Sequence, residues 1–304
     1  MNAARTRRGS PGSRAARRER QVLWLLLLPF LSAALALVVA PAVLVLVRSL
    51  QQFDAGAPEW VGLANYRRVV ADPAFAVALR NTAVYLVLTV PCKVLAALGL
   101  ALALARPRRG VPLWRAAIYL PSVVPAVAYA LVWLWWLNPQ DGPLNRILRG
   151  VGAPVFAGVA APETALPSLA LAGIFQLGEA FVVLLAGAMA IPREVGDAAR
   201  LEGAGQWARL RFIVLPLLAP WLVLATVREL IVAVQYSFTP ALVMTGGGPG
   251  QATLLLPQYL VRLAVDHRDL GAAAALACLD LAALAVVLAL LAWWSRGWRD
   301  VLDP

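Results

Sequence analysis

Long apolar runs alternate with short polar segments along most of this 304-residue chain. A helix needs about 20 predominantly apolar residues to cross the hydrocarbon core of a bilayer. The runs that meet this requirement cover approximately residues 22–47, 83–105, 113–137, 166–190, 217–236 and 270–294. The pattern therefore predicts an all-α integral membrane protein with six transmembrane helices, which together occupy residues 22–296.

The composition excludes an ordinary soluble domain, because 61% of the residues are hydrophobic and the mean hydropathy is +0.74. A net charge of +11 could indicate nucleic-acid binding. The arginines, however, gather in the polar segments between the apolar runs, where membrane topology explains them. We therefore expect a lipid bilayer, and no nucleic acid, among the partners.

The arginine-rich segments also predict an orientation. The positive-inside rule places segments 106–115 and 191–216 in the cytoplasm, and six spans put both termini on that same side. Residues 1–21 hold seven arginines and are typical of a disordered basic cytoplasmic arm. A signal peptide is the alternative, but the apolar run that follows is long enough to span the membrane. Residues 297–304 are expected to form a short cytoplasmic tail.

The polar segment 191–216, between the fourth and fifth runs, has the pattern of a helix, a break and a second helix. Pro192 suits a first helical turn, and Glu194 and Asp197 favour the positive N-terminal end of a helix. Gly203 permits the left-handed turn that ends a helix. The segment is therefore expected to cap two membrane helices.

Small and apolar side chains give this segment the composition of a docking surface. Ala198 and Ala199 are small enough to let another surface approach the backbone closely. Leu201, Trp207 and Phe212 offer apolar contact to a partner. An ordinary polar loop that only reverses the chain is the alternative interpretation.

The spacing of residues here resembles the pattern of ABC importer permeases. That pattern is an acidic residue, two alanines, a glycine four positions after the second alanine, then nine residues and I-x-L-P. It is carried by Asp197, Ala198, Ala199, Glu202, Gly203, Ile213, Leu215 and Pro216. The family usually has Glu in place of Asp197 and commonly Asp in place of Glu202, and both changes keep the charge. The resemblance implies a type I ABC importer permease fold with a cytoplasmic coupling helix seated in a separate ATPase subunit.

Three other segments resemble the sugar-type members of that family. They are the stretch from Asn65 to Thr82, the N-P-x-x-G-x-x-N run at 138–145, and T-G-G-G-P from Thr245. The glycine run could instead be a phosphate cradle, but it has no lysine and does not lead directly into a predicted helix. One departure is Thr239, which stands where those proteins often carry an aspartate.

The resemblance also implies a set of partners. Such a permease works with a similar second permease, two ATP-binding subunits, an extracytoplasmic solute-binding protein and a sugar, in a bacterial cell membrane. Lys93 is the only lysine in the chain, and no G-x-x-x-x-G-K-[ST] phosphate loop surrounds it. We therefore expect no cofactor on this chain, ATP being bound by the partner subunits. We also find no catalytic constellation, which predicts a transporter subunit rather than an enzyme.

Ionisable residues inside the predicted spans cost on the order of 3 kcal/mol each and usually face a bundle interior or a wet cavity. Glu179 and Arg228 fall near the middle of the fourth and fifth spans, so we expect them to pair. Arg228 and Glu229 are adjacent and point about 100° apart on a helix, so their contact cannot replace that pair. Lys93 and Asp280 are the other charges at membrane depth.

Two glutamines extend these charges into a polar stripe. Gln176 lies three residues before Glu179, and Gln235 lies seven after Arg228, each on the helical face of its charged neighbour. Together with Glu229 they predict a substrate pathway that hydrogen-bonds a polyhydroxyl solute. Contacts that only hold the helices together are the alternative.

Other functions remain open at this point. An importer of the same class could carry another solute, such as a polyol or glycerol phosphate. An ion-coupled secondary transporter would also explain buried acids such as Glu179 and Asp280. A structural membrane protein without transport would leave the coupling pattern unexplained.

Overall fold

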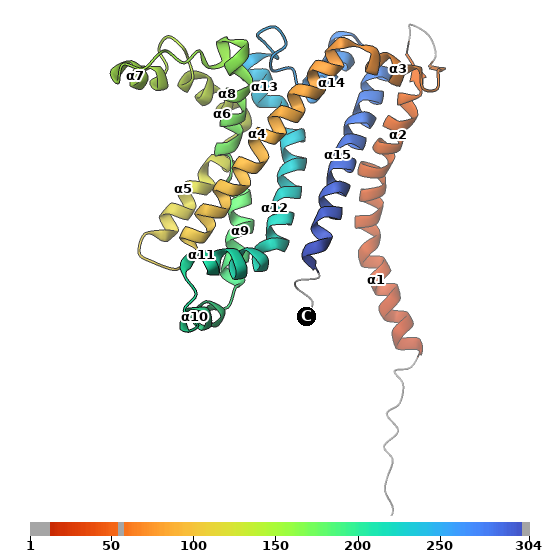
Figure 1. Ribbon diagram of the computed structural model, residues 1–304. Helices are drawn as coiled ribbons and strands as arrows, with labels where there is room; N and C mark the ends of the chain where they lie inside the picture. The colour runs from red at the N-terminus through yellow and green to blue at the C-terminus, as the bar shows by residue number, and fades with distance from the viewer. Residues whose placement is uncertain (1–12, 54–57, 300–304) are drawn as a thin grey trace, which may run out of the picture.

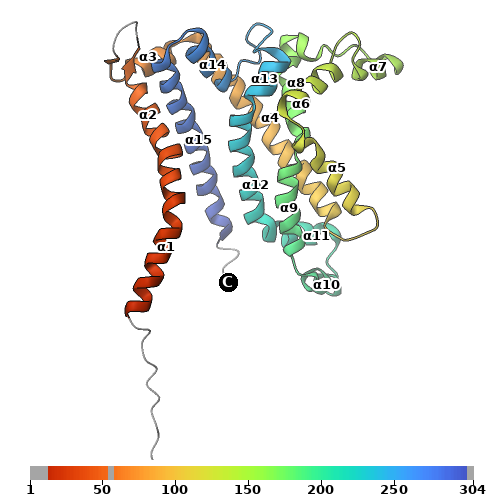
Figure 2. The same ribbon diagram turned by 180° about the vertical axis from the view of Figure 1, so that it is seen from behind.

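The computed structural model describes residues 13–53 and 58–299 and is predominantly helical. Its first span consists of α1 (Ser13–Ala34), the π-helix η1 (Leu35–Val39) and α2 (Ala40–Ser49). These segments lie at one side of the molecule, beside the C-terminal helix, as both views show (Figures 1 and 2). None of the most apolar part of this span is buried within the chain, so its surface is left for lipid or another subunit.

The two ends of the chain depart from the predicted boundaries. Residues 1–12 of the predicted disordered arm lie outside the described residues, whereas residues 13–21 are already helical in α1. The last helix, α15 (Leu270–Arg299), continues through the first residues of the predicted tail. Residues 300–304 of that tail lie outside the described residues. Helices thus extend past the apolar runs, because a helix does not have to end where the membrane does.

The second span is one long helix, α4 (Pro73–Leu104). Asp72 caps its N-terminus, since the carboxylate accepts a hydrogen bond of 2.8 Å from the Ala74 amide. Pro73 occupies the first turn, where its missing N–H costs nothing. The helix therefore begins before the apolar run at Ala83 and crosses the whole molecule.

The third and fourth spans are bent pairs of helices rather than single helices. α5 (Val111–Val123) and α6 (Ala126–Trp136) meet at 100°, and α8 (Pro162–Phe175) and α9 (Gly178–Ala190) meet at 44°. Pro125 explains the first break, because a proline pushes the preceding residue out of the helical region. Four described helices can each cross a membrane, and six spans result if each bent pair counts as one.

The fifth span starts earlier than predicted. α11 (Gln206–Arg209), the π-helix η3 (Leu210–Val214) and α12 (Leu215–Tyr236) form one span of 31 residues. The Leu215 amide bonds to the Leu210 carbonyl, as in a π-helix. Pro216, which has no N–H, follows at once.

The shorter elements are β1 (Gln51–Gln52), β2 (Glu59–Trp60), α3 (Ala64–Ala71), α7 (Pro143–Gly150), η2 (Gly158–Ala160), α10 (Arg193–Leu201), α13 (Phe238–Thr245), α14 (Leu256–Val261) and η4 (Arg262–Asp266).

The main core lies where α4 packs against α8, α9 and α12. Phe181, Leu184 and Leu218 are almost completely buried there. α9 and α12 approach closely at Gly187, where an added Cβ would lie 2.4 Å from the ring of Trp221. Any larger residue at position 187 would therefore push these two helices apart.

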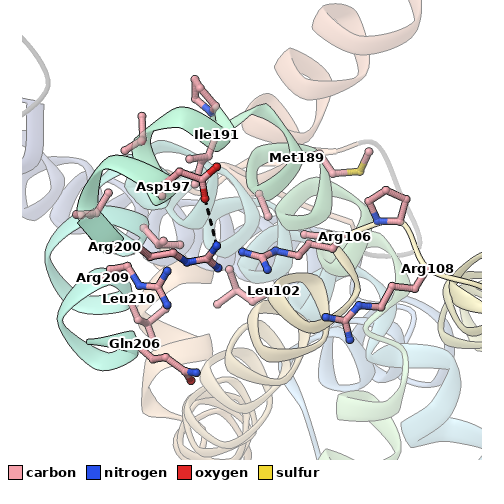
Figure 3. A pocket seen from close by; sticks show the side chains of 18 of the residues that line it. Leu102, Arg106, Arg108, Met189, Ile191, Asp197, Arg200, Gln206, Arg209 and Leu210 are labelled. Atoms are coloured by element: carbon pink, nitrogen blue, oxygen red, sulfur yellow. Dashed lines mark hydrogen bonds and ion pairs between the residues drawn. The ribbon is translucent and has the colours of Figure 1, made fainter. Parts of the chain in front are cut away.

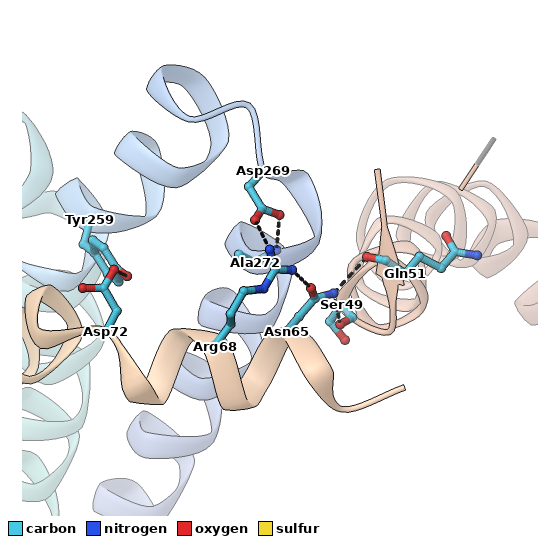
Figure 4. A network of polar contacts seen from close by, with 8 residues as sticks. All are labelled: Ser49, Gln51, Asn65, Arg68, Asp72, Tyr259, Asp269 and Ala272. Carbon is cyan, nitrogen blue, oxygen red and sulfur yellow. Dashed lines mark hydrogen bonds and ion pairs between the residues drawn. The ribbon is translucent and has the colours of Figure 1, made fainter. Parts of the chain in front are cut away.

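At the end of the molecule opposite α10, polar side chains tie α2, α3 and α15 together (Figure 4). Asn65 is fully buried and donates to the carbonyls of Ser49 and Gln51, both at 2.9 Å. Arg68 contacts Asn65 and forms an ion pair of 2.9 Å with Asp269. The side chain of Asp269 also accepts from the amide of Ala272 and so caps α15.

The same end holds the glycine-rich loop that follows α13. Asn81 of α4 donates to the carbonyls of Gln251 and Leu254, at 2.9 and 3.1 Å. The hydroxyl of Thr82 accepts from the amide of Leu256 at 2.9 Å. The polar residues near the start of α4 therefore hold the glycine-rich loop in place.

α14 is fixed to α4 by a phenol. Tyr259 donates to the carboxylate of Asp72 at 2.6 Å. Burial, and then this hydrogen bond, raise the pKa of Tyr259 above its ordinary value, so the phenol keeps its proton and remains a donor. Internal hydrogen bonds thus join α3, α14, the start of α4 and the glycine-rich loop at this end of the molecule, which is named the α3–α14 end.

Candidate functional site

The helix–break–helix motif predicted between the fourth and fifth spans is present as α10 followed by α11. α10 ends at Leu201, and Gly203 adopts the left-handed conformation with φ of 82°. The Ala204 amide bonds to the Ala199 carbonyl at 2.9 Å, and the Gly203 amide bonds to the Arg200 carbonyl at 3.0 Å. This pair of bonds is a Schellman motif, which ends the helix and turns the chain into α11. Figure 1 shows α10 projecting below α9 and α11 at the lower end of the molecule.

The outer surface of this motif is apolar and exposed. Leu201 is 91% exposed, and Trp207 and Phe212 are each 70% exposed. Single exposed apolar residues are common, but three large ones around one short turn favour contact with another protein. Ala198 is exposed as expected, whereas Ala199 is buried within the chain. The expectation that another surface approaches both alanines is therefore wrong for Ala199, which is buried within the chain.

The other residues of the coupling pattern divide into two groups. Asp197 and Glu202 are exposed on α10 and at its end, and Asp197 forms an ion pair of 3.1 Å with Arg200. Ile213, Leu215 and Pro216 are half-buried in η3 and at the start of α12. The first group is available to a partner, and the second connects the motif rigidly to the fifth span.

A chain of four charges crosses the interior of the bundle. Arg228 of α12 contacts Glu179 of α9, and this predicted pair is confirmed. Arg228 also contacts Glu229 at 2.9 Å, because a long guanidinium side chain can fold back along its own helix. This contact adds to the Glu179 pair and does not replace it, as expected.

Glu229 has a second partner that the sequence analysis missed. The ammonium of Lys93 lies 2.7 Å from its carboxylate, and the two side chains are only 8% and 1% exposed. The sequence held only a partial signal, since pairing Glu179 with Arg228 left Lys93 with two possible acids at membrane depth, Glu229 and Asp280. A buried pair of this kind avoids the larger cost of a lone charge in the membrane interior.

The polar stripe predicted as a substrate pathway is only partly continuous. Gln176 caps α8 at the break before α9, so it does not share one helical face with Glu179. That part of the prediction is wrong because it assumed an unbroken helix. Gln235 is exposed on α12, and Glu179 and Arg228 are partly exposed, with side chains 43% and 33% accessible. Glu229 is buried among its charged partners and is not accessible to a solute in this conformation.

These features define a multi-pass membrane protein of the ABC importer permease class: long apolar helices, an exposed helical motif between two of them, and balanced charges within the bundle. The chain belongs to the family of binding-protein-dependent transport system inner membrane components, whose pattern matches residues 93–300.

Two curated relatives resemble most of the chain. The probable ABC transporter permease protein YesP of Bacillus subtilis is 30% identical over 292 residues, covering 94% of this chain and 94% of that protein. The sulfoquinovosyl glycerol transport system permease protein SmoG of Agrobacterium fabrum is 33% identical over 220 residues, covering 72% and 71%. Both comparisons extend beyond the coupling pattern to most of the membrane helices.

A solved structure shares the fold. The bacterial alginate ABC transporter, in complex with an alginate pentasaccharide-bound periplasmic protein, superimposes with a TM-score of 0.79. The match is 20% identical in sequence and covers 92% of this chain and 95% of the matched chain. The likeness supports the type I ABC importer permease fold.

Proposed function

We propose that this chain is the transmembrane permease subunit of an ATP-driven importer that translocates a sugar. The observation that carries the proposal is the exposed α10 motif in a chain of this family. Separate ATP-binding subunits would contact Leu201, Trp207 and Phe212, and a movement of α10 would reach the bundle through η3 and α12. The chain has no phosphate-loop sequence of its own, so the nucleotide chemistry belongs to these partners.

The proposed setting is the inner membrane of a bacterium, with α10 and both termini on the cytoplasmic side. In Figure 1 the start of α1, the end of α15 and α10 lie at the same end of the molecule. Arginines of segment 106–115 lie at that end too, in agreement with the positive-inside rule. The α3–α14 end would then face the extracytoplasmic solute-binding protein that delivers the sugar.

Several observations support a polyhydroxyl substrate. SmoG is named for a sulfoquinovosyl glycerol, and the alginate transporter was solved with a pentasaccharide on its periplasmic protein. The charges at membrane depth in α4, α9 and α12 balance, which suits a neutral or weakly charged solute. Gln235, Glu179 and Arg228 are accessible enough to meet it. A polyol or glycerol phosphate is the alternative cargo.

Reconstitution tests this proposal. The chain would be purified from its native membrane with any accompanying subunits and placed in liposomes that contain ATP. Uptake of radiolabelled mono-, di- and oligosaccharides, a polyol and glycerol phosphate would then be measured with the solute-binding protein outside. We expect uptake of one sugar that requires ATP and the binding protein. Uptake driven by an ion gradient without ATP would instead establish a secondary transporter.

A further inference from the structure

A cavity of about 840 Å³ lies beside α10, where arginines from several elements meet. Its walls come from the ends of α4 and α9, the α4–α5 turn, α10, and the start of the α11–α12 span. Figure 3 shows the side chains of Arg106, Arg200 and Arg209 extending toward the same space. Two more arginines, Arg108 and Arg115, also line the cavity, and Asp197 is the one acid among the lining residues.

The positive charge in this cavity is not neutralised by the chain itself. Asp197 pairs with Arg200, and Arg115 donates to the carbonyls at the C-terminal end of α4. Arg106, Arg108 and Arg209 form no ion pair with any described residue. Guanidinium groups that face the same space repel one another, and the repulsion is screened less around the half-buried Arg209 than around the exposed Arg106 and Arg108.

One of these arginines also has a buried donor without an acceptor. The Nε of Arg209 is inaccessible to solvent and makes no hydrogen bond within the part of the chain that the structure describes. Such a donor costs about 1–3 kcal/mol when it stays unsatisfied. Because this Nε is closed off from solvent, an anion in the cavity would have to meet the other nitrogens of Arg209, where its negative charge would offset the repulsion among the guanidinium groups.

The shape of the cations indicates the chemistry of that anion. The planar fork of a guanidinium matches two oxygens of a phosphate group, and such bonds are strong because both partners are charged. We propose that the cavity binds a phosphate-bearing anion, held by Arg106, Arg108 and Arg209. A phospholipid headgroup and a soluble phosphate compound share this chemistry.

The remaining walls favour the lipid. Leu102, Met189 and Leu210 line the same cavity, so an acyl chain can lie against apolar surface while the headgroup meets the arginines. The bound phosphate would join α11, which follows α10 after a short turn, to the α4–α5 turn and so brace the motif that carries α10. This bracing role rests on the proposed function, whereas the binding of the anion does not.

The test is a binding titration on the chain as purified from its native membrane, with whatever subunits accompany it. Thermal unfolding would be followed while phosphatidylglycerol in mixed micelles is added, against phosphatidylcholine as the zwitterionic control. A parallel titration uses inorganic pyrophosphate against sodium chloride at equal ionic strength. We expect one of the two probes to stabilise the protein saturably beyond its control.

Substitutions of the arginines show whether the stabilisation arises from binding in the cavity. Arg106→Gln and Arg209→Gln should each raise the probe concentration at half-saturation by about tenfold, since each removes a charged hydrogen-bond donor. Arg211→Gln is the matched control, because Arg211 is exposed two residues beyond Arg209 and does not line the cavity. Arg106→Lys keeps the charge but loses the fork, so it should weaken binding less and serves if the Gln variant does not fold.

The outcomes are separable. Saturation by phosphatidylglycerol alone identifies a lipid site, and saturation by pyrophosphate identifies a site for soluble phosphates; both support the proposal. An adventitious, non-specific charge effect would appear as equal half-saturation in wild type, Arg209→Gln and Arg211→Gln, and it would overturn the proposal. So would the absence of saturable stabilisation by either probe. Failure of the proposed function would show separately, as a preparation that contains no ATP-binding subunit.

Discussion

Polar and apolar side chains are arranged in opposite ways at the two ends of this molecule. At the α3–α14 end, Asn65 and Asn81 are buried and donate to backbone carbonyls of neighbouring segments. At the α10 end, Leu201 and Trp207 are exposed and the arginines of the cavity outnumber their acidic partners. The first end pairs most of its buried polar groups within the chain, Gln258 Nε2 being an exception, while the second exposes apolar and cationic groups that partners can bind.

The helix α4 joins these two regions and explains how they can differ. Asn81 lies near its start, Lys93 lies at membrane depth, and its C-terminal residues line the arginine cavity. Substitutions in the closed region should therefore change the stability of the chain, whereas substitutions around α10 should change association and leave the fold intact. The following predictions test that separation.

The largest effect is expected from Lys93→Met, which leaves Glu229 buried with only Arg228 as a cationic partner. Removing one member of a buried pair typically costs about 3–5 kcal/mol. The free energy of unfolding would be measured by titrating SDS into mixed micelles. In the double variant Lys93→Met with Glu229→Gln the buried charge is gone, and much of the stability should return. A single variant as stable as wild type would contradict the structural role of the pair.

A smaller loss is expected from Asn81→Ala at the α3–α14 end. The substitution removes two hydrogen bonds to the carbonyls of Gln251 and Leu254 and should cost about 2 kcal/mol in unfolding free energy. Arg146→Ala is a control, because Arg146 is exposed on α7. Equal stability of the two variants would show that Asn81 does not hold the glycine-rich loop.

Leu201→Asp should act on association instead. Because Leu201 is 91% exposed, its replacement should change the unfolding free energy by no more than about 0.5 kcal/mol. The affinity of the Leu201→Asp variant for the ATP-binding subunits should nevertheless fall by at least about tenfold, as expected for a central apolar contact. Affinity would be measured by pull-down at graded subunit concentrations. Leu63→Asp, at an exposed residue beside α3, is the matched control.

The smallest effect is expected from Arg200→Gln. Its ion pair with Asp197 joins side chains that are 47% and 66% exposed, and such pairs contribute about 0–1 kcal/mol. The SDS titration should show little change for this variant. A loss of unfolding free energy as large as that of Asn81→Ala would show that side chains at the α10 end also stabilise the fold.

Much of the architecture follows from the sequence because hydropathy and helix-ending signals act locally. The apolar runs located the membrane helices, and Gly203 marked the turn after α10. The break between α5 and α6 has such a signal in Pro125, but the bend between α8 and α9 could not be predicted in the same way. A break such as that after Gln176 lies inside an apolar run, and its geometry depends on packing, for example the Gly178 amide bonding to the hydroxyl of Ser122.

The site was predictable in part for the same reason. The pairing of Glu179 with Arg228 followed from their similar depth, but the contact of Lys93 with Glu229 required the position of α4 beside α12. The burial of Ala199 could not be read from its size, since a small residue suits an internal contact as well as an external one. The arginine cavity combines residues from separate elements and has no continuous sequence pattern.

Site-specific photo-crosslinking from position 201 would show whether α10 contacts an ATP-binding subunit. A photoreactive amino acid would replace Leu201 in the full chain, and the crosslinked products from native membranes would be identified by mass spectrometry. We expect a crosslink to an ATP-binding subunit from position 201 and none from position 63. Crosslinks to lipid alone, or the same subunit captured equally from both positions, would contradict the assignment of α10 as the contact with the ATPase.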